Sequence, residues 1–298
     1  MVEQAVTAIL VTYNSSDVIV ASLAALLRQP EISQIIVVDN CSVDNTRDVI
    51  AQAFPNVTVI ANPKNDGFGR ANNIGLEKVQ TDFALLVNPD AVLEDGALNA
   101  MLIAATQYPD TGIVSPMLLD IKGGLHHNFK RNVFIREKYR PDFIQPEGDC
   151  CAEYLSGAVW LMNMKYTRKV GFFDSNIFLF YEDDDLCLRM RQADYSLVVA
   201  HNARALHLQG ESSGKATPQK DFFIQKHMMW SRLYIEYKYH GEAAAKKLLI
   251  KIAIVNWLKF FMYSIFFSKR KVMRLRGRLK GVAEFSESLK SGNMQRQP

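Results

Sequence analysis

VTAILVTYNSSDVIVASLAALLRQPEISQIIVVDN, residues 6–40, contains two apolar runs with a segment of helical spacing between them. The runs, 6–13 and 34–40, are nearly continuously apolar and rich in Val and Ile, as is typical of strands that are covered on both faces. Residues 16–28 are expected to form a helix that ends near Pro30. Strand, helix and strand in this order are the repeating unit of a parallel α/β sheet.

The same alternation of apolar runs and helical segments continues along the chain. It predicts helices over 44–54 and 67–79 and strands over 57–61 and 82–87. Residues 121–150 lose this rhythm and are expected to form a long loop near the functional site, because such loops are usually functional. The later elements expected are a strand over 154–163, a helix over 182–193, short strands near 195–200 and 204–208, and helices from about Pro218 onward.

The 298-residue chain is long enough for one large α/β domain or two small ones, and its hydrophobic fraction of 48% is ordinary for a globular protein. Its four cysteines form no CxxC pair, which argues against a zinc ribbon or a disulfide framework and favours a reducing, cytosolic location. The first residues run directly into a strand pattern, so no signal peptide is expected.

Charge is distributed unevenly along the chain. From Ala243 to the end there are 13 Lys and Arg against 2 Asp and Glu, a net charge of +11. The first 242 residues carry 22 basic and 29 acidic groups, a net charge of −7. We therefore expect an acidic α/β domain over 1–240 and a basic, helical extension over 241–298 that meets an anionic surface.

Polar residues follow each of the first four expected strands at the point where the strand ends. In a parallel α/β sheet, ligands bind beyond the carboxyl ends of the strands. Turn chemistry could explain any one cluster, since Asn, Asp and Gly favour turns, but four in series indicate a ligand site. The clusters are Thr12-Tyr13-Asn14, Asp39-Asn40, Asn65-Asp66-Gly67 and Asn88-Pro89-Asp90.

Five segments carry a resemblance to a known family: VTYN, VVDNCSVDNT, NPKNDGFGRANNIGL, LLVNPDA and FLFYEDDDLCLR. In this order they resemble the family 2 glycosyltransferases of the GT-A fold, and within them the rhamnosyltransferase-like branch of bacterial polysaccharide assembly. The resemblance covers about residues 5–240. It implies an α/β, Rossmann-like nucleotide-binding fold with a mixed central sheet and a helical C-terminal extension.

The resemblance also implies a divalent metal, Mg²⁺ or Mn²⁺, at the end of the fourth strand. Asp90 lies where the family keeps an Asp-x-Asp metal site, and the ion would bridge the donor diphosphate. Asn88 replaces the first acid of that motif, which leaves one firm carboxylate ligand, and is expected near the sugar pocket. His207 follows a later strand, from which many enzymes of this fold supply a further ligand; a structural histidine is the alternative.

The donor nucleotide is expected at the ends of the first two strands. Asp39 resembles the family aspartate that accepts the N3–H of a uracil or thymine ring. Tyr13 is expected to line the base, with Thr12 and Asn14 beside it, and a core aromatic is the alternative for Tyr13.

The third helix is expected to approach the same nucleotide. Gly67, Phe68 and Asn72 open this helix. In the family this segment lies against the nucleotide, and its glycines allow close backbone contact at a helix N-terminus.

Four consecutive acids, Glu182 to Asp185, begin a helix directly after an apolar run. Acids at a helix start also complement the helix dipole, which is the bland alternative. The segment matches the family's Glu-Asp motif, so the resemblance makes Asp183 the general base, held with Glu182 beside the sugar. Asp185 and Arg189 are four residues apart and are expected to form a structural ion pair.

Gly157 lies in a segment that resembles the part of the family that lines the donor-sugar or acceptor pocket.

Residues 248–268 are strongly apolar and aromatic, but Lys251 and Lys259 interrupt them and a basic run follows from Lys269. Two lysines argue against a membrane-spanning helix and favour a helix that lies in the membrane interface. The alternative is a helix packed on the α/β domain or on the partner of a homodimer.

Together these features predict an inverting, metal-dependent glycosyltransferase at the inner face of a bacterial-type membrane. It would move a hexose, with L-rhamnose from dTDP-rhamnose as the first choice, to a hydroxyl of a lipid-linked or growing cell-surface glycan such as an O-antigen. Its expected partners are the nucleotide-sugar donor, the lipid-linked acceptor and an anionic membrane, and no nucleic acid. A UDP-sugar donor, a nucleotidyltransferase and a non-catalytic membrane-associated scaffold are the rival interpretations; the last is disfavoured by the intact Asp39, Asp90 and Asp183.

Overall fold

The computed structural model describes residues 5–125, 129–130, 146–208, 217–265 and 269–294. They form two compact units. The α/β unit comprises Met1–Asp66, Arg70–Phe173 and Asp183–Gly214, and the helical unit comprises Gly67–Gly69, Asp174–Glu182 and Lys215–Pro298.

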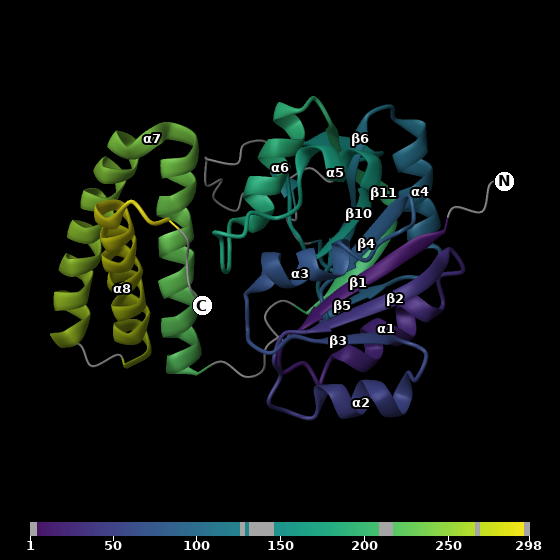
Figure 1. Cartoon of the computed structure of the whole chain (residues 1–298), viewed down its shortest axis with the longest axis horizontal. Coiled ribbons are helices and arrows are strands. Elements are labelled where there is room, and N and C mark those ends of the chain that lie inside the picture. The colour runs from purple at the N-terminus through teal and green to yellow at the C-terminus, as the bar shows by residue number, and fades with distance from the viewer. Residues whose placement is uncertain (1–4, 126–128, 131–145, 209–216, 266–268, 295–298) are drawn as a thin grey trace. The chain divides into compact units, whose positions relative to one another are not determined.

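A mixed sheet of nine strands forms the centre of the α/β unit (Figure 1), within the residues described. Its first four strands in sequence are parallel, as predicted, and the strands that follow include antiparallel ones. The predicted α/β class, with a mixed sheet, is therefore confirmed. In spatial order the strands are β3 (Thr58–Ala61), β2 (Ile32–Asp39), β1 (Val6–Thr12), β4 (Phe83–Val87), β10 (Val159–Asn163), β6 (Thr111–Leu119), β11 (Ser196–His207) and β5 (Ala91–Leu93), with β8 (Cys150–Ala152) paired to β11.

Helices cover both faces of this sheet, because alternate strand residues point to opposite sides. Ala8 and Leu10 of β1 pack in one buried cluster with residues of α1 (Ile19–Leu27), α2 (Thr46–Ala53) and α4 (Ala97–Gln107). Ile9 between them packs in a second cluster with residues from the opposite face. That face is covered by α3 (Phe68–Leu76), α5 (Met164–Val170) and α6 (Glu182–Gln192).

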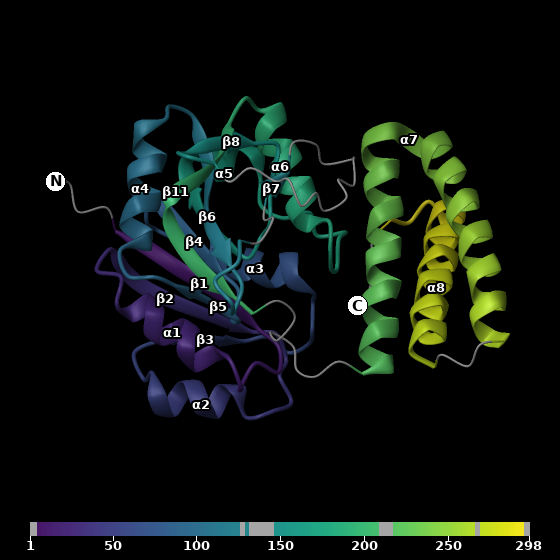
Figure 2. The same cartoon turned by 180° about the vertical axis from the view of Figure 1, so that it is seen from behind.

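Two strand predictions were wrong in detail. The predicted strand over 154–163 is divided by a turn into β9 (Tyr154–Leu155) and β10. β9 pairs with β7 (Phe129–Lys130; labelled in Figure 2) in a small separate sheet. The two short strands expected near 195–200 and 204–208 are one strand, β11, whose register shifts between Ala200 and Arg204. Most of the loop expected over 121–150 lies outside the described residues.

Two long helices make up most of the helical unit: α7 (Pro218–Ile265) and α8 (Lys269–Ser291). The path of α7 breaks at Gly241, where φ is 84° and ψ is 174°. Figures 1 and 2 show α8 alongside the two arms that this break creates. The predicted domain boundary after residue 240 falls at the break, and it stays a prediction.

Glycines let α8 approach the first arm of α7 closely. A Cβ atom at Gly277 would overlap the carbonyl oxygen of Phe222, and one at Gly281 would overlap that of Lys226. The buried aromatic rings of Trp230 and Phe285 then meet edge to face across the two helices. No helix among the described residues has the length and apolar character needed to span a bilayer.

Candidate active site

The carboxyl ends of β1 and β2 bring Thr12 and Asp39 together, because the two residues are register partners. The Thr12 hydroxyl donates to Asp39 Oδ1 at 3.2 Å, and the backbone N–H of Ser42 donates to Oδ2 at 3.2 Å. Arg47 Nε lies 3.5 Å from the same Oδ2. Asp39 is buried, so its carboxylate is fixed in position by these groups.

Tyr13 and Asn14 follow β1 with different roles. The Tyr13 side chain is 37% exposed, which excludes the core-aromatic alternative. Asn14 has a positive φ of 55°, and its Oδ1 accepts from the backbone N–H of Val43 at 2.8 Å. Asn14 therefore holds the turn after β2 against the end of β1, and Tyr13 is the accessible member of the pair.

A network of amides orders the segment before α3. Asn40 Nδ2 donates to Asn65 Oδ1 at 2.9 Å, and Asn62 Nδ2 donates to Asn40 Oδ1 at 2.9 Å. Asn62 also donates to Asp66 Oδ2 at 3.1 Å. Asn62 was not among the predicted site residues; its position beside Pro63, just after a strand, was the sequence signal that could have indicated it.

Gly67 and Phe68, predicted to approach the nucleotide, contact the backbone of Phe178 within the helical unit. A Cβ at Gly67, where φ is 83°, would overlap the Phe178 carbonyl oxygen, and the Phe68 N–H donates to that oxygen at 3.0 Å. The close approach that requires a glycine here is therefore an approach to protein backbone. The nucleotide role of Gly67, Phe68 and the buried Asn72 stays a prediction.

Asp90 and His207, the two predicted metal ligands, lie side by side. His207 Nε2 is 3.4 Å from Asp90 Oδ1. The pairing of β5 with β11 places them there, because Ala91 and His207 are register partners and the Leu208 N–H donates to the Asp90 carbonyl at 3.0 Å. A carboxylate and an imidazole next to one another suit a divalent ion that takes its other ligands from phosphate and water. Within the described residues no three such side chains gather around one point.

Asp183 lies at the start of α6, and three hydrogen-bond donors surround its carboxylate. The Tyr154 hydroxyl donates to Asp183 Oδ2 at 2.6 Å, and the Gly157 N–H lies 3.4 Å from the same oxygen. The Asp184 N–H donates to Oδ1 at 3.0 Å. Burial, and then the charges of Asp183 and Asp184, raise the pKa of Tyr154 well above its ordinary value. Its hydroxyl therefore stays protonated and remains a donor.

The turn before β10 links Asp183 to the metal candidates. Gly157 contacts Asp183, and the next residue, Ala158, accepts from the Asn88 N–H at 2.8 Å. Asn88 in turn accepts from Ala91, directly after Asp90, at 3.0 Å. A short series of hydrogen bonds thus runs from the Asp183 carboxylate to the backbone on either side of Asp90.

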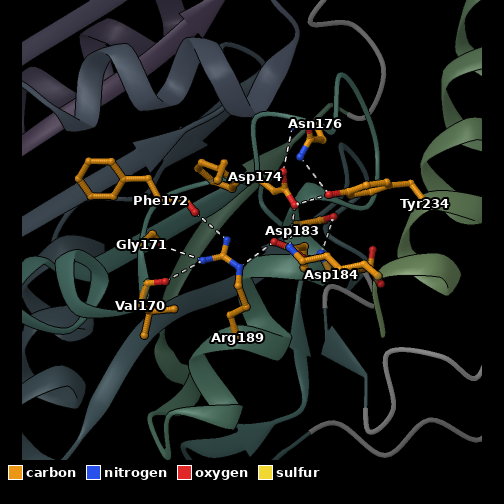
Figure 3. Close-up of polar contacts among 12 residues, drawn as sticks. Val170, Gly171, Phe172, Asp174, Asn176, Asp183, Asp184, Arg189 and Tyr234 are labelled. Carbon is orange, nitrogen blue, oxygen red and sulfur yellow. Dashed lines mark hydrogen bonds and ion pairs between the residues drawn. The ribbon is translucent and has the colours of Figure 1, made fainter. Parts of the chain in front are cut away.

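Asp185 and Arg189 form the structural ion pair that was predicted. Arg189 Nε donates to Asp185 Oδ2 at 2.8 Å, and Asp185 is fully buried. The same guanidinium donates to three carbonyls at the end of α5 and just after it (Figure 3), those of Val170, Gly171 and Phe172, at 3.2, 2.9 and 2.6 Å. The pair therefore ties α6 to the end of α5.

The segment that leads to Glu182 belongs to the helical unit and is held by α7. Asp174 Oδ2 accepts from Lys238 Nζ at 2.7 Å and from the Tyr234 hydroxyl at 3.0 Å, as Figure 3 shows for Tyr234. Phe180 and Tyr181, just before the buried Glu182, have positive φ values of 66° and 70°. Non-glycine residues seldom adopt this conformation, and strained backbone of this kind gathers at functional sites.

The profile described as "Glycosyl transferase family 2" matches residues 7–171. The chain belongs to this family. Among curated proteins it is 26% identical over 269 residues to the N-acetylglucosaminyl-diphospho-decaprenol L-rhamnosyltransferase of Mycobacterium tuberculosis, covering 77% of this chain and 86% of that protein. It is 31% identical over 99 residues to the succinoglycan biosynthesis protein ExoO of Rhizobium meliloti, covering 33% of this chain and 28% of that protein. The predicted resemblance to the rhamnosyltransferase-like branch of the family is confirmed.

Solved structures share the fold of this family 2 glycosyltransferase at low sequence identity. GalNAc-T7 with UDP, GalNAc and Mn²⁺ superposes with a TM-score of 0.61 at 11% identity, over 98% of this chain and 58% of that one. The mannosyltransferase PcManGT of Pyrobaculum calidifontis with GDP-Man and Mn²⁺ gives 0.54 at 13% identity, over 94% and 86%. S. aureus TarS 1–349 with UDP gives 0.53 at 14% identity, over 97% and 92%. The predicted GT-A fold is thereby confirmed, and family membership indicates a glycosyltransferase of the inverting type.

Proposed function

We propose that this glycosyltransferase moves L-rhamnose from dTDP-rhamnose to a hydroxyl of a lipid-linked glycan at the inner face of the membrane. The observation that carries the proposal is the contact chain from Asp183 through the 157–158 turn to Asp90 and His207. It supports the proposal because it connects the candidate base and the candidate metal ligands through neighbouring turns at the ends of β4 and before β10. The choice of sugar and acceptor rests on the L-rhamnosyltransferase of Mycobacterium tuberculosis, to which the chain is similar.

Asp183 is the general base in this proposal. Of the three consecutive aspartates, Asp184 and Asp185 are buried and Asp183 is the one with accessible surface. The acceptor hydroxyl gives its proton to the Asp183 carboxylate while its oxygen bonds to the anomeric carbon. The bond from that carbon to the diphosphate oxygen breaks on the opposite side, so the configuration inverts and the nucleoside diphosphate leaves.

Asp39 recognises the base of the donor. A thymine ring presents an N3–H donor, and Asp39 is a carboxylate whose position is fixed by Thr12 and Ser42. Tyr13, exposed beside it, offers a ring face for stacking. A uracil ring presents the same edge, which keeps UDP-sugars as the rival donors.

Asp90 and His207 would hold a divalent ion, Mg²⁺ or Mn²⁺. Such an ion would supply positive charge that offsets the negative charge developing on the departing diphosphate. The protein's contribution is to hold the two side chains 3.4 Å apart at the β5–β11 pairing.

The test is a donor screen with the purified protein and a short polyprenyl-diphosphate-linked N-acetylglucosamine acceptor. dTDP-rhamnose with Mn²⁺ or Mg²⁺ should give a rhamnosylated product, and EDTA should abolish it. Thermal unfolding measured in parallel reports binding independently, because a ligand that binds only the native state raises its stability. If UDP-sugars stabilised the protein and dTDP-rhamnose did not, dTDP-rhamnose would be rejected as the donor. Product formed with UDP-sugars would establish them as the donors instead. Binding with neither turnover nor donor hydrolysis would indicate the non-catalytic scaffold.

A further inference from the structure

The second arm of α7, which follows the break at Gly241, turns large apolar side chains toward solvent. Six of them are 52–71% exposed. Their spacing of three, four or one residues places them on one side of the helix. They are Ile250, Ile254, Trp257, Leu258, Phe261 and Met262, here called the apolar face.

The opposite side of the same arm is packed inside the helical unit. Ala245 and Ile252 are buried in its core with Trp230 and Phe285. The arm is thus held in place on one side, and the apolar face is not needed for that packing. Isolated exposed apolar residues are ordinary, but a continuous row of six large ones on a helix marks an interaction surface.

Positive charge accompanies this face. Lys247, Lys251 and Lys259 on the same arm are exposed, and so are Lys269 and Lys271 at the start of α8. No acidic residue occurs between Glu242 and Glu284. An apolar row bordered by lysines and free of acids complements a surface that is apolar inside and anionic outside.

Part of the basic run is already used within the protein. Arg270 and Arg274 both pair with Asp221 of α7, and Arg278 Nε donates to Gln225 Oε1 at 2.6 Å. The electrostatic attraction predicted from the +11 charge of the tail is therefore smaller than the count of basic residues indicates. Binding to a lipid surface would depend chiefly on insertion of the apolar face.

We propose that the apolar face docks on an anionic lipid bilayer, with its aromatic and aliphatic side chains at the boundary between headgroups and acyl chains. The lysines around it reach the anionic headgroups, and the helix lies in the interface without crossing the bilayer. The inference rests on the proposed function in one respect: a lipid-linked acceptor places the enzyme at a membrane.

Tryptophan fluorescence tests this directly, because Trp257 is exposed while Trp160 and Trp230, the other two tryptophans of the chain, are buried. Adding phosphatidylglycerol–phosphatidylcholine vesicles to the full-length protein should shift the emission to the blue, and brominated acyl chains should quench it. Trp257→Phe should still co-sediment with vesicles but lose both signals. Unchanged emission at saturating vesicle concentration would overturn the proposal. A shift that depends on protein concentration without lipid, with dimers in sedimentation, would assign the face to a second copy of the chain.

Substitutions give the second arm of the test. Trp257→Ser with Phe261→Ser should lower vesicle partitioning at least about a hundredfold, since each large side chain removed from the interface costs about tenfold or more. Ile103→Ser on α4 removes a comparably exposed side chain from the other unit and should bind vesicles normally. Equal vesicle partitioning of the wild type, the double variant and Ile103→Ser would refute the docking of the apolar face.

Failure of the proposed function is distinguishable from failure of this inference. The double variant should keep donor hydrolysis, whereas Asp183→Asn should lose turnover and still bind vesicles. Vesicle binding by an inactive wild-type protein would leave the docking face intact and overturn the enzyme proposal alone.

Discussion

Asp183 and Asp185 lie two residues apart at the start of the same helix, yet their surroundings differ. Asp185 is fully buried and paired with Arg189, which also donates to the carbonyls at the end of α5 and just after it. Asp183 keeps accessible surface and accepts from neutral donors, the Tyr154 hydroxyl and backbone N–H groups.

The difference shows how to separate a structural acid from a candidate catalytic one. The buried Asp185 carboxylate is held by the Arg189 guanidinium, which also binds the carbonyls at the end of α5, so this acid serves the fold. Neutral donors orient a carboxylate without compensating its charge to the same degree, and they leave lone pairs for a substrate. By this criterion Asp183 is available for proton transfer, and Asp185 is not.

The largest effect expected is on turnover in Asp183→Asn. The amide keeps the size of the side chain and can still accept from Tyr154, but it cannot take a proton at neutral pH. Turnover should fall at least about a hundredfold, about 2.7 kcal/mol in activation free energy, while donor binding survives. Steady-state kinetics and donor titration measure the two quantities separately.

Asp184→Asn and Asp185→Asn are the matched controls for that variant. Near-normal turnover in Asp183→Asn together with an inactive but folded Asp185→Asn would move the base to Asp185 and break the comparison. Full activity in all three would reject general-base catalysis by this motif.

The second effect is on stability in Arg189→Met. Removing the guanidinium leaves Asp185 buried without its charge partner and three carbonyls without their donor. Losing one partner of a buried pair costs about 3–5 kcal/mol, so the free energy of unfolding should drop by that order. Turnover per folded molecule should stay close to wild type. Denaturant titration would contradict the structural role if it showed a loss below about 1 kcal/mol.

Much of the fold followed from the sequence because the strands of a parallel sheet are covered on both faces and read as apolar runs. β1, β2, β3 and β4 were predicted this way within a residue or two. The mistakes concern residues whose structure depends on distant partners. The turn that divides β9 from β10 forms where β9 pairs with Phe129 and β10 pairs with β4, and neither pairing leaves a mark in the local sequence.

In the candidate site, too, contacts between residues far apart in the sequence were not predicted. Strand-end carboxylates such as Asp39 and Asp90 were predicted from their local position. Tyr154 was not, because its contact with Asp183 joins residues 29 positions apart and the surrounding sequence reads only as a strand. Gly67 was expected to face a nucleotide, and its neighbour in the structure, Phe178, could not be identified from spacing.

The third effect is a smaller loss of turnover in Tyr154→Phe. The hydroxyl orients Asp183 through one hydrogen bond to a charged group, and losing it should lower kcat about tenfold with little change in donor KM. The phenyl ring preserves the packing of the buried Tyr154. A fall in thermal stability with an unchanged kcat would make Tyr154 a packing residue only.

The smallest effect expected is on the pH dependence of stability in Asp174→Asn. It adds a third acid, Asp174, to the comparison of Asp183 with Asp185. Burial opposes ionisation of this carboxyl group, but the hydrogen bonds from Lys238, Asn176 and Tyr234, with the Lys238 charge, outweigh it and lower the pKa of Asp174 below its ordinary value. A lowered folded-state pKa means that the ionised form stabilises the fold. That contribution is complete above the unfolded-state pKa, near 3.9, and is lost as pH falls through the folded-state pKa.

Asp174→Asn should therefore be less stable than wild type at neutral pH, and the difference should narrow as the pH falls below about 4. Lys238→Met should reproduce this pattern, because it removes the charged partner that lowers the pKa of Asp174. Neither change should move the limbs of the pH–rate profile, because those depend on the group that exchanges a proton with the substrate. Urea titrations at several pH values give the stability difference. A difference that stays constant from pH 7 to pH 3 would show that Asp174 acts without changing its ionisation. If either substitution moved the pH–rate profile, Asp174 would take part in the proton transfer as well as in stability. The distinction between structural acids and a catalytic Asp183 would then not hold for Asp174.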